Sequence, residues 1–397
     1  MKDIQLFKYL EGDRTIWMIS IILALISILA VYSSISSLAY KFQDGNTFHF
    51  LLKHGLMLGM GFVIMYGMHK MPHRWLYKLS QLLIYITAGL LLFTLLFGSS
   101  INSASRWLTI PIINQSFQTS DLAKMVLIAF VARMLSKKQN DLKSFSKGLL
   151  PVIGPIFLIC GLILPANFST AFLLLSVCMC ILFVAGARIV HLLGLAAAGV
   201  LIFISLMGMA SAFPDLLPRM NTWKNRIVAF SQDEPVERST EMDLQRNYQV
   251  EMAKIAIHRG GLLPNGPGKG TSRNYLPHPY SDMIYAFIIE EYGSILGGLG
   301  ILLLYVILLF RVIRIAGQCK KRFSAYLALG LGLLMVFQAL SNMAVAVNLI
   351  PVTGQPLPLV SMGGTSLWFT CLSIGIILSI SRENQLSSPH QAQAVNG

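Results

Sequence analysis

An aspartate, several cations and a glycine-rich loop are the residues whose types and spacing could do chemistry in this sequence. Asp282 follows Pro277 and Pro279 and comes directly before a long apolar run. A carboxylate is favourable at the start of a helix, so Asp282 could simply cap one. The same position also suits a general base, because an exposed acid can accept a proton from a hydroxyl group. Both interpretations stay open on position alone.

The loop before Asp282 carries basic residues among glycines and prolines. Its cations are Arg259, Lys269 and Arg273. A glycine-rich turn can hold phosphate through its backbone N–H groups. It is not a nucleotide-binding P-loop, because Pro267 stands where that motif requires lysine. The loop is either a surface turn or a basic pocket for a lipid-linked phosphate.

Acids inside apolar runs are the second kind of candidate. Glu290 lies eight residues after Asp282, which is roughly 12 Å further along a helix. Such an acid usually faces a cavity or a partner, and an ion pair that fixes packing is the alternative. Asp121 and Lys124 are spaced i,i+3, so we expect them to share a helix face and pair. Arg106 and Trp107 precede them and resemble an interfacial anchor pair.

The composition defines the environment of these residues. Of 397 residues, 55% are hydrophobic and 12% are charged, about half the charged fraction of a soluble domain. This excludes a soluble enzyme, a disordered regulator and a disulfide-stapled secreted domain. Five cysteines without a CxxC pair predict neither a disulfide framework nor a metal site. In a membrane protein the net charge of +14 sets topology and does not indicate a nucleic-acid partner.

The apolar runs predict an all-α polytopic membrane protein with about ten transmembrane helices. With an even number of spans, both termini lie on one side. That side holds 18 Lys and Arg residues in its short segments and the other side holds 4, which predicts cytoplasmic termini. One long extracytoplasmic loop, about 214–282, then joins helices seven and eight. The expected spans are 16–39, 50–68, 77–97, 121–136, 149–165, 169–186, 190–213, 283–310, 324–347 and 364–381.

This topology gives a simple domain organisation and places the chemistry. A cytoplasmic N-terminus (1–15) and a cytoplasmic C-terminal tail (383–397) flank one transmembrane domain (16–382). The polar segments 98–120, 214–282 and 348–364 all fall on the outer face, where no nucleoside triphosphate is available. Segment 348–364 is rich in proline and glycine, and non-helical backbone at membrane depth must be shielded by protein or line a cavity.

Four stretches carry a resemblance to a known family. They are NSASRW (102–107), QTSDLAK (118–124), LPHPYSDMIYAFIIEEYG (276–293) and PVTGQPLPLVSMGGTS (351–366). At this separation in a ten-span chain they resemble the SEDS family (shape, elongation, division and sporulation), which includes FtsW and RodA. The resemblance covers about residues 16–382. Departures occur at Thr119, Asp121 and Met362, and Ala166 stands where the family usually has an acid, so no role is carried over to that position.

The resemblance implies a peptidoglycan glycosyltransferase that polymerises lipid II into β-1,4-linked glycan on the outer face of the bacterial cytoplasmic membrane. The family's essential aspartate corresponds to Asp282, the catalytic candidate, and its fourth-span pair corresponds to Asp121 and Lys124. The expected partners are lipid II, a class B penicillin-binding protein and other division proteins. The candidate substrate-binding residues are Arg106, Trp107, Asp121, Lys124, Arg259, Lys269, Arg273, Glu290 and Ser361.

The expected mechanism needs one base and several cations. Asp282 would take the proton of the acceptor hydroxyl, and the cations would stabilise the leaving pyrophosphate, with no certain cofactor beyond a possible divalent Mg or Mn ion. A lipid II flippase, a non-catalytic scaffold for a transpeptidase and a RodA-type elongation polymerase are the alternatives. A division role of the FtsW type is favoured over elongation.

Overall fold

The structure is a computed structural model of the 397-residue chain. It describes residues 11–34, 47–101, 104–110, 115–212, 223, 230, 241–275 and 282–387. Residues 214–222, 224–229, 231–240 and 276–281 of the expected long loop 214–282 lie outside these ranges, as do residues 1–10 and 388–397 of the expected tails.

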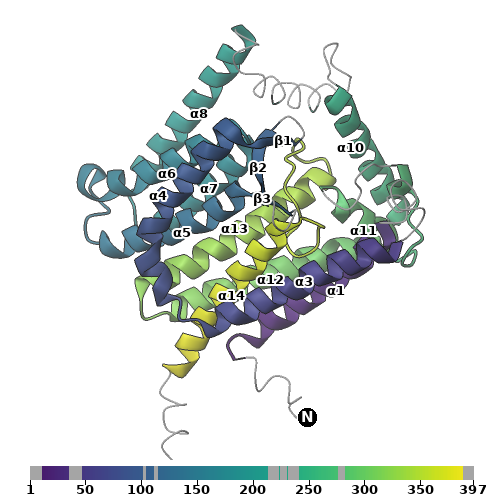
Figure 1. Ribbon diagram of the computed structural model, residues 1–397, viewed down its shortest axis with the longest axis horizontal. Coiled ribbons are helices and arrows are strands. Elements are labelled where there is room, and N and C mark those ends of the chain that lie inside the picture. The colour runs from purple at the N-terminus through teal and green to yellow at the C-terminus, as the bar shows by residue number, and fades with distance from the viewer. Residues whose placement is uncertain are drawn as a thin grey trace, which may run out of the picture.

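Helices make up most of the described chain, and Figure 1 shows them gathered into one bundle with α10 at its edge. Three short irregular helices, η2 (Phe145–Leu149), η3 (Ser272–Tyr275) and η4 (Gly293–Leu299), adjoin the regular ones. The α-helices are α1 (Arg14–Ser34), α3 (Thr47–Lys70), α4 (Arg74–Phe97), α5 (Thr119–Lys137), α6 (Leu150–Ile163), α7 (Phe168–Val184), α8 (Ile189–Ala212), α10 (Glu241–Gly260), α11 (Ile284–Tyr292), α12 (Gly300–Gln318), α13 (Arg322–Ala346) and α14 (Thr365–Leu386).

The chain is a multi-pass membrane protein. Seven helical stretches in its described part are long and apolar enough to cross a membrane. Helices α3 and α4 present large exposed apolar side chains, including Val63 and Tyr85, as expected for a surface that faces lipid. Ten spans remain a prediction, since α5 carries charges and α7 has 17 residues.

Helix α13 forms the centre of the bundle. Most of its length is buried, and it packs against α5, α7, α12 and α14. Two glycines allow this close packing: a Cβ at Gly330 would lie 2.5 Å from Ile128 Cγ2, and one at Gly332 would lie 2.5 Å from Val312 Cγ1. Small residues at helix contacts let the backbones of membrane helices approach closely. The residues on α13 are therefore held rigidly between four neighbours.

The first and last spans meet at one end of the bundle. Gly12 N donates to Gln385 Oε1 at 3.1 Å, and Gln385 Nε2 donates back to Gly12 O at 3.0 Å. We call this the terminal end. Helix α13 starts there and runs to the opposite end, where it meets the non-helical segment 348–364. The strands lie at that opposite end too, which is the upper part of Figure 1.

A small sheet corrects the expectation of an all-α fold with a plain loop at 98–120. Strands β1 (Ser99–Ile101), β2 (Ala104–Ile110) and β3 (Gln115–Gln118) form an antiparallel meander in the order β1-β2-β3. The sequence Trp-Leu-Thr-Ile within β2 is rich in residues that favour strands. The ring of Phe117 lies 5.6 Å from that of Phe369, so the sheet packs on α14.

The expected continuous span 283–310 is broken into a helical hairpin. Helix α11 ends at Gly293, whose φ of 73° suits only glycine well. The chain then folds back: Tyr285 Oη donates to Gly298 O at 3.1 Å, and a Cβ on Gly297 would lie 2.7 Å from Ile288 O. In a straight helix Ile288 and Gly297 would be roughly 13 Å apart. Helix α11 is therefore a short buried helix beside the bundle, and α12 is the long helix that follows.

Candidate functional site

Asp282 lies directly before α11, at the end of the bundle opposite the terminal end. Its side chain is partly buried. Its main chain is fixed by Asn342 of α13, whose Nδ2 donates at 2.8 Å to Asp282 O and at 2.8 Å to Gln355 O. One buried amide therefore joins the candidate base to the segment 348–364.

The segment 348–364 packs against the carboxylate of Asp282. Gly354 has a φ of +68°, and a Cβ there would lie 3.7 Å from Asp282 Oδ2. Glycine thus gives the backbone a turn that other residues adopt at a cost, and it leaves room beside the acid. The carboxylate of Asp282 therefore lies next to the irregular backbone of this segment.

Protein side chains hold segment 348–364, as expected for non-helical backbone inside a membrane protein. Gln355 Nε2 donates to Thr170 Oγ1 at 2.8 Å, and Tyr305 Oη donates to Pro358 O. Ser27 Oγ donates to Val360 O at 2.7 Å. The segment is therefore anchored to α7, α12 and α1 at three separate points.

Ser361 has a structural contact in this segment. Its hydroxyl accepts a hydrogen bond from Leu357 N at 2.8 Å, and the residue is buried. That bond closes a turn in the backbone. The substrate-binding role expected for Ser361 stays a prediction.

Asp121 and Lys124 form the expected ion pair on α5. Lys124 Nζ lies 2.7 Å from Asp121 Oδ1, and the two side chains are 7% and 4% exposed. Asp121 Oδ2 has no hydrogen-bond partner within the described part of the chain. A buried ion pair is weak evidence for a gain in stability, and the substrate-binding role expected for Asp121 and Lys124 stays a prediction.

A second amide of α13 connects the ion pair to segment 348–364. Lys124 Nζ donates to Gln338 Oε1 at 3.4 Å, and Gln338 Nε2 donates to Pro356 O at 2.9 Å. Gln338 and Asn342 are one turn apart and share a face of α13. The candidate base and the candidate cation are therefore held by neighbouring residues of one rigid helix.

The carboxylate of Glu290 supports the glycine-rich loop. Its Oε1 accepts hydrogen bonds from Thr271 N at 3.0 Å, Ser272 N at 3.1 Å and Ser272 Oγ at 2.9 Å. Asn265 Nδ2 donates to the Glu290 carbonyl at 3.0 Å. These contacts are those of a loop anchor, and a direct role of Glu290 in substrate binding stays a prediction.

The neighbouring acid has a different contact. Glu291 accepts a hydrogen bond from Ser33 Oγ of α1, and its carbonyl accepts one from Gly266 N at 2.9 Å. The end of α11 is thus connected both to the first span and to the loop.

The remaining expected substrate-binding residues lie on β2 and around the glycine-rich loop. Arg259 and Lys269 are exposed, and Arg259 Nη1 donates to Thr271 Oγ1 at 2.6 Å. Arg106 and Trp107 lie on β2, where Trp107 pairs with Gln118 next to the start of α5. Their side chains, and that of Arg273, lie outside the described residues. The roles of all five as substrate ligands stay predictions.

Sequence reasoning missed the amides that organise the site. Gln338, Asn342 and Gln355 are buried, and they join α13, α7 and segment 348–364. The available signal was Gln338 and Asn342 at i,i+4 inside an apolar span, because polar residues there usually face a partner or a cavity.

The divalent Mg or Mn ion expected as a cofactor stays a prediction. No three His, Cys, Asp or Glu side chains in the described part of the chain group as ligands for an ion.

The chain matches a family model over residues 13–386, described as "Cell cycle protein" and named for FtsW, RodA and SpoVE. It belongs to the FtsW/RodA/SpoVE family. This confirms the SEDS resemblance across almost the whole sequence.

Two curated relatives illustrate the family. Stage V sporulation protein E of Bacillus subtilis is 32% identical over 383 residues, covering 94% of this chain and 98% of the relative. A probable peptidoglycan glycosyltransferase FtsW of Geobacter sp. (strain M18) is 33% identical over 382 residues, with 94% and 98% covered. The expectation of an enzyme of the peptidoglycan glycosyltransferase class is confirmed at the level of this family.

Solved structures show the same fold. A chain from "Structural coordination of polymerization and crosslinking by a peptidoglycan synthase complex" superposes with a TM-score of 0.71 at 24% identity, covering 94% of this chain and 98% of that one. The rod-shape-determining protein RodA of Thermus thermophilus gives a TM-score of 0.65 at 22% identity, with 94% and 97% covered. A RodA-like fold is therefore established for the chain.

Proposed function

We propose that this chain polymerises lipid II, with Asp282 as the general base, on the outer face of the cytoplasmic membrane. The 4-hydroxyl of one lipid-linked disaccharide attacks the anomeric carbon of another. A new glycosidic C–O bond forms, the bond from the anomeric carbon to pyrophosphate breaks, and the hydroxyl proton passes to the Asp282 carboxylate. Undecaprenyl pyrophosphate leaves as an anion, and inversion at an α-linked donor gives a β-1,4 product.

The observation that carries this proposal is the joint anchoring of Asp282 and Lys124 on one face of α13. Asn342 holds the backbone of Asp282, and Gln338 bonds to Lys124 at 3.4 Å. A glycosidase needs a second carboxylate because an alcohol leaving group must be protonated. Pyrophosphate needs only neutralisation of its charge, so one carboxylate and nearby cations suffice.

Lys124 is the first candidate to stabilise the leaving group, with Arg106, Arg259, Lys269 and Arg273 as further candidates. A substrate phosphate that approached Lys124 would compete with Asp121 for its ammonium group. If the phosphate displaced Asp121 from Lys124, the environment of the Asp121 carboxylate would change during turnover. Its Oδ2 atom has no hydrogen-bond partner among the described residues. Trp107, Glu290 and Ser361 would shape the pocket for the sugars and the lipid.

The deciding experiment is glycan polymerisation by purified protein supplied with lipid II in detergent. The variant Asp282→Asn keeps the shape of the side chain but cannot act as a base, and we expect a rate loss of about 100-fold or more. The matched control is Asp141→Asn, an exposed acid in the turn after α5. A folded Asp282→Asn enzyme with full activity would end the assignment.

A lipid II flippase is the second candidate. The α11–η4 hairpin and the non-helical segment 348–364 favour it, because transporters build their sites from interrupted helices. The same assay separates the two functions. Detergent micelles have no second compartment, so a polymer forms there only if the chain is an enzyme.

The cellular role we propose is septal synthesis during division, in a complex with a class B penicillin-binding protein that cross-links the new strand. Relatives with the FtsW name support this choice over the elongation role of RodA. Depletion in the source cell tests it by microscopy. Filaments would indicate a septation defect, whereas rounded cells would indicate elongation and overturn the septal assignment.

A further inference from the structure

A pocket at the terminal end of the bundle has no part in the proposed reaction. It lies between the start of α4 and the last turns of α14 and has a volume of about 450 Å³. Its polar and apolar walls include Arg74, Trp75, Lys78, Arg382, Glu383 and Leu386. We call it the basic pocket.

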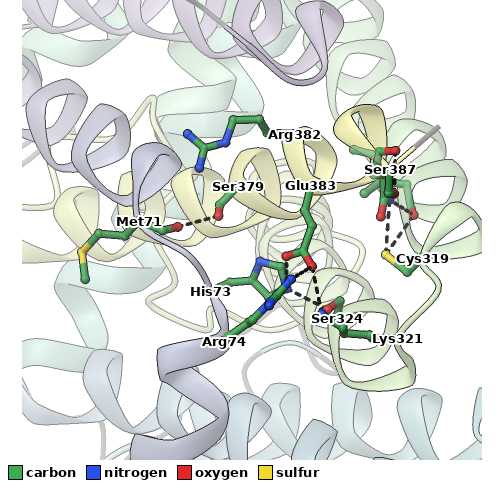
Figure 2. Close-up of polar contacts among 12 residues, drawn as sticks. Met71, His73, Arg74, Cys319, Lys321, Ser324, Ser379, Arg382, Glu383 and Ser387 are labelled. Carbon is green, nitrogen blue, oxygen red and sulfur yellow. Dashed lines mark hydrogen bonds and ion pairs between the residues drawn. The ribbon is translucent and has the colours of Figure 1, made fainter. Parts of the chain in front are cut away.

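The single acid of this wall is already neutralised. Figure 2 shows Glu383 pointing toward Arg74 and Lys321, which lie 2.8 Å and 3.0 Å from its Oε1. The guanidinium of Arg382 is directed elsewhere: Nη2 donates to Lys70 O at 3.1 Å, and Nη1 lies 3.6 Å from Glu11 Oε2. The pocket therefore has an excess of positive charge.

Lys78 is the cation with the fewest contacts. Its Nζ lies 5.9 Å from the centroid of the Trp75 ring, and it forms no ion pair with any residue that the structure describes. Lys78 and Trp75 are both exposed. An ammonium group beside an interfacial tryptophan is well placed to contact an anion from the surrounding medium.

The start of α4 adds to this attraction. The N-terminal end of a helix carries partial positive charge, so acids are favoured and basic residues disfavoured there. Helix α4 has no acid in its first turn, and its N-cap residue, His73, provides no side-chain cap hydrogen bond. Arg74 and Lys78 therefore add positive charge at a point where an external anion would be stabilising.

An exposed apolar stripe leads away from the basic pocket. Trp75, Leu79, Leu82 and Ile86 recur at i, i+4, i+7 and i+11, so they share one face of α4. Their exposed fractions are 56%, 42%, 59% and 47%. A ligand with a charged head in the pocket could lay an apolar chain along this face. A soluble phosphate ion would leave the stripe uncovered.

We propose that the basic pocket binds the phosphodiester headgroup of an anionic membrane phospholipid, such as phosphatidylglycerol, with its acyl chain along the α4 stripe. Basic pockets between membrane helices are suited to such headgroups. Arg74 and Lys78 bind the phosphate, and Trp75 marks the level of the interface. The proposal is independent of the polymerisation reaction, which takes place at the other end of the bundle.

Native mass spectrometry of the full-length protein in neutral detergent tests the proposal by titration with phosphatidylglycerol. We expect one molecule of phosphatidylglycerol to bind per protein, and to bind more tightly than zwitterionic phosphatidylcholine does. Each cation near an anionic group contributes roughly fivefold, so the double variant Arg74→Gln/Lys78→Gln should bind about 30-fold more weakly. The single variant Lys78→Glu breaks no described ion pair and should also lose binding.

The matched control is Arg314→Gln/Arg322→Gln, which removes two exposed cations outside the pocket at the same end of the bundle. It should bind the lipid as the unchanged protein does. Inorganic phosphate in large molar excess separates the two sources of the anion, and we expect it not to displace the lipid. The proposal is overturned if folded pocket variants keep their affinity, if the control loses as much affinity as they do, or if phosphate displaces the lipid.

Discussion

Asn342 joins the backbone of Asp282 to that of Gln355, because its single Nδ2 group donates to both carbonyl oxygens at 2.8 Å. The amide is 1% exposed, so water does not replace either bond. The position of the proposed base therefore depends on a residue of α13 that lies 60 positions later in the chain.

Replacing this amide should lower both the stability of the protein and its turnover rate. Asn342→Leu keeps the number and branching of the side-chain heavy atoms but leaves two carbonyls without a donor, which costs about 1–3 kcal/mol of unfolding free energy. Misplacement of the base should lower kcat by about 100-fold with little change in KM. The control is Asn384→Leu, which removes a similar bond to Ile315 O at the terminal end and should affect stability alone. Equal kcat values for the two variants would contradict a positioning role.

The ion pair on α5 gives a second prediction. Lys124→Met leaves the buried Asp121 charge uncompensated and should cost about 3–5 kcal/mol of stability. The double variant Asp121→Asn/Lys124→Met should recover much of that stability but no polymerase activity, since the cation is still missing. Thermal unfolding and lipid II polymerisation measure the two effects separately. Recovery of activity in the double variant would show that the pair is only structural.

Glu290 should control the order of the glycine-rich loop. In Glu290→Gln the acceptor for Thr271 and Ser272 loses its charge, and charge-assisted bonds are about twice as strong as neutral ones. We expect faster hydrogen exchange at the backbone amides of residues 266 and 268–272, measured by mass spectrometry. Glu251→Gln on the exposed side of α10 should leave exchange in that loop unchanged. If Glu290→Gln leaves the exchange unaltered too, the loop-anchor interpretation is wrong.

The lowered pKa of His73 leads us to expect that the protein loses stability in acid. Burial lowers the pKa of His73 from 6.5 to about 4, and nearby Glu383 only partly opposes this. The unfolded chain therefore binds a proton between pH 6.5 and pH 4 that the folded protein does not bind. Stability is full above pH 6.5 and decreases as the pH falls toward 4, by up to roughly 3 kcal/mol from this residue.

The variant His73→Gln isolates this contribution. Glutamine does not titrate, so the difference in melting temperature between variant and unchanged protein should shrink as the pH is lowered from 7 to 5. The side chain of His73 also bonds to Ser324 Oγ at 2.7 Å, and loss of that bond shifts the whole curve without changing its slope. Parallel curves would show that His73 does not titrate in this range.

The sequence predicted the parts of the fold that depend on local pattern. Continuous apolar runs placed the helices within a few residues, and the i,i+3 spacing predicted the Asp121–Lys124 ion pair. The apolar pattern did not reveal the break at Gly293 within the expected span 283–310, because the residues before and after the turn are equally apolar. The turn depends on contacts with Leu262 and Leu263, which are distant in sequence.

The sequence indicated the charged candidate residues of the site but not the uncharged amides that hold them in place. Asp282 attracted notice because an acid stands out before an apolar run. Gln338 and Asn342 carry no charge, and their importance depends on which backbone carbonyls lie across from them. The sequence predicts for Glu290 a cavity, a partner or an ion pair, and only the folded loop shows the N–H groups of Thr271 and Ser272 on its carboxylate.

The hairpin at Gly293 has a mechanical consequence. Helix α11 is a stiff rod about 13 Å long, with Asp282 just before its first residue and the contacts of Glu290 and Glu291 to the glycine-rich loop at its last turn. Because α11 is held at both ends, we expect a displacement of that loop to move the helix and, with it, the carboxylate of Asp282, the proposed base. If Asp282 is the base, a partner protein that binds the loop would change the rate of strand growth from a distance, without contacting the sugars.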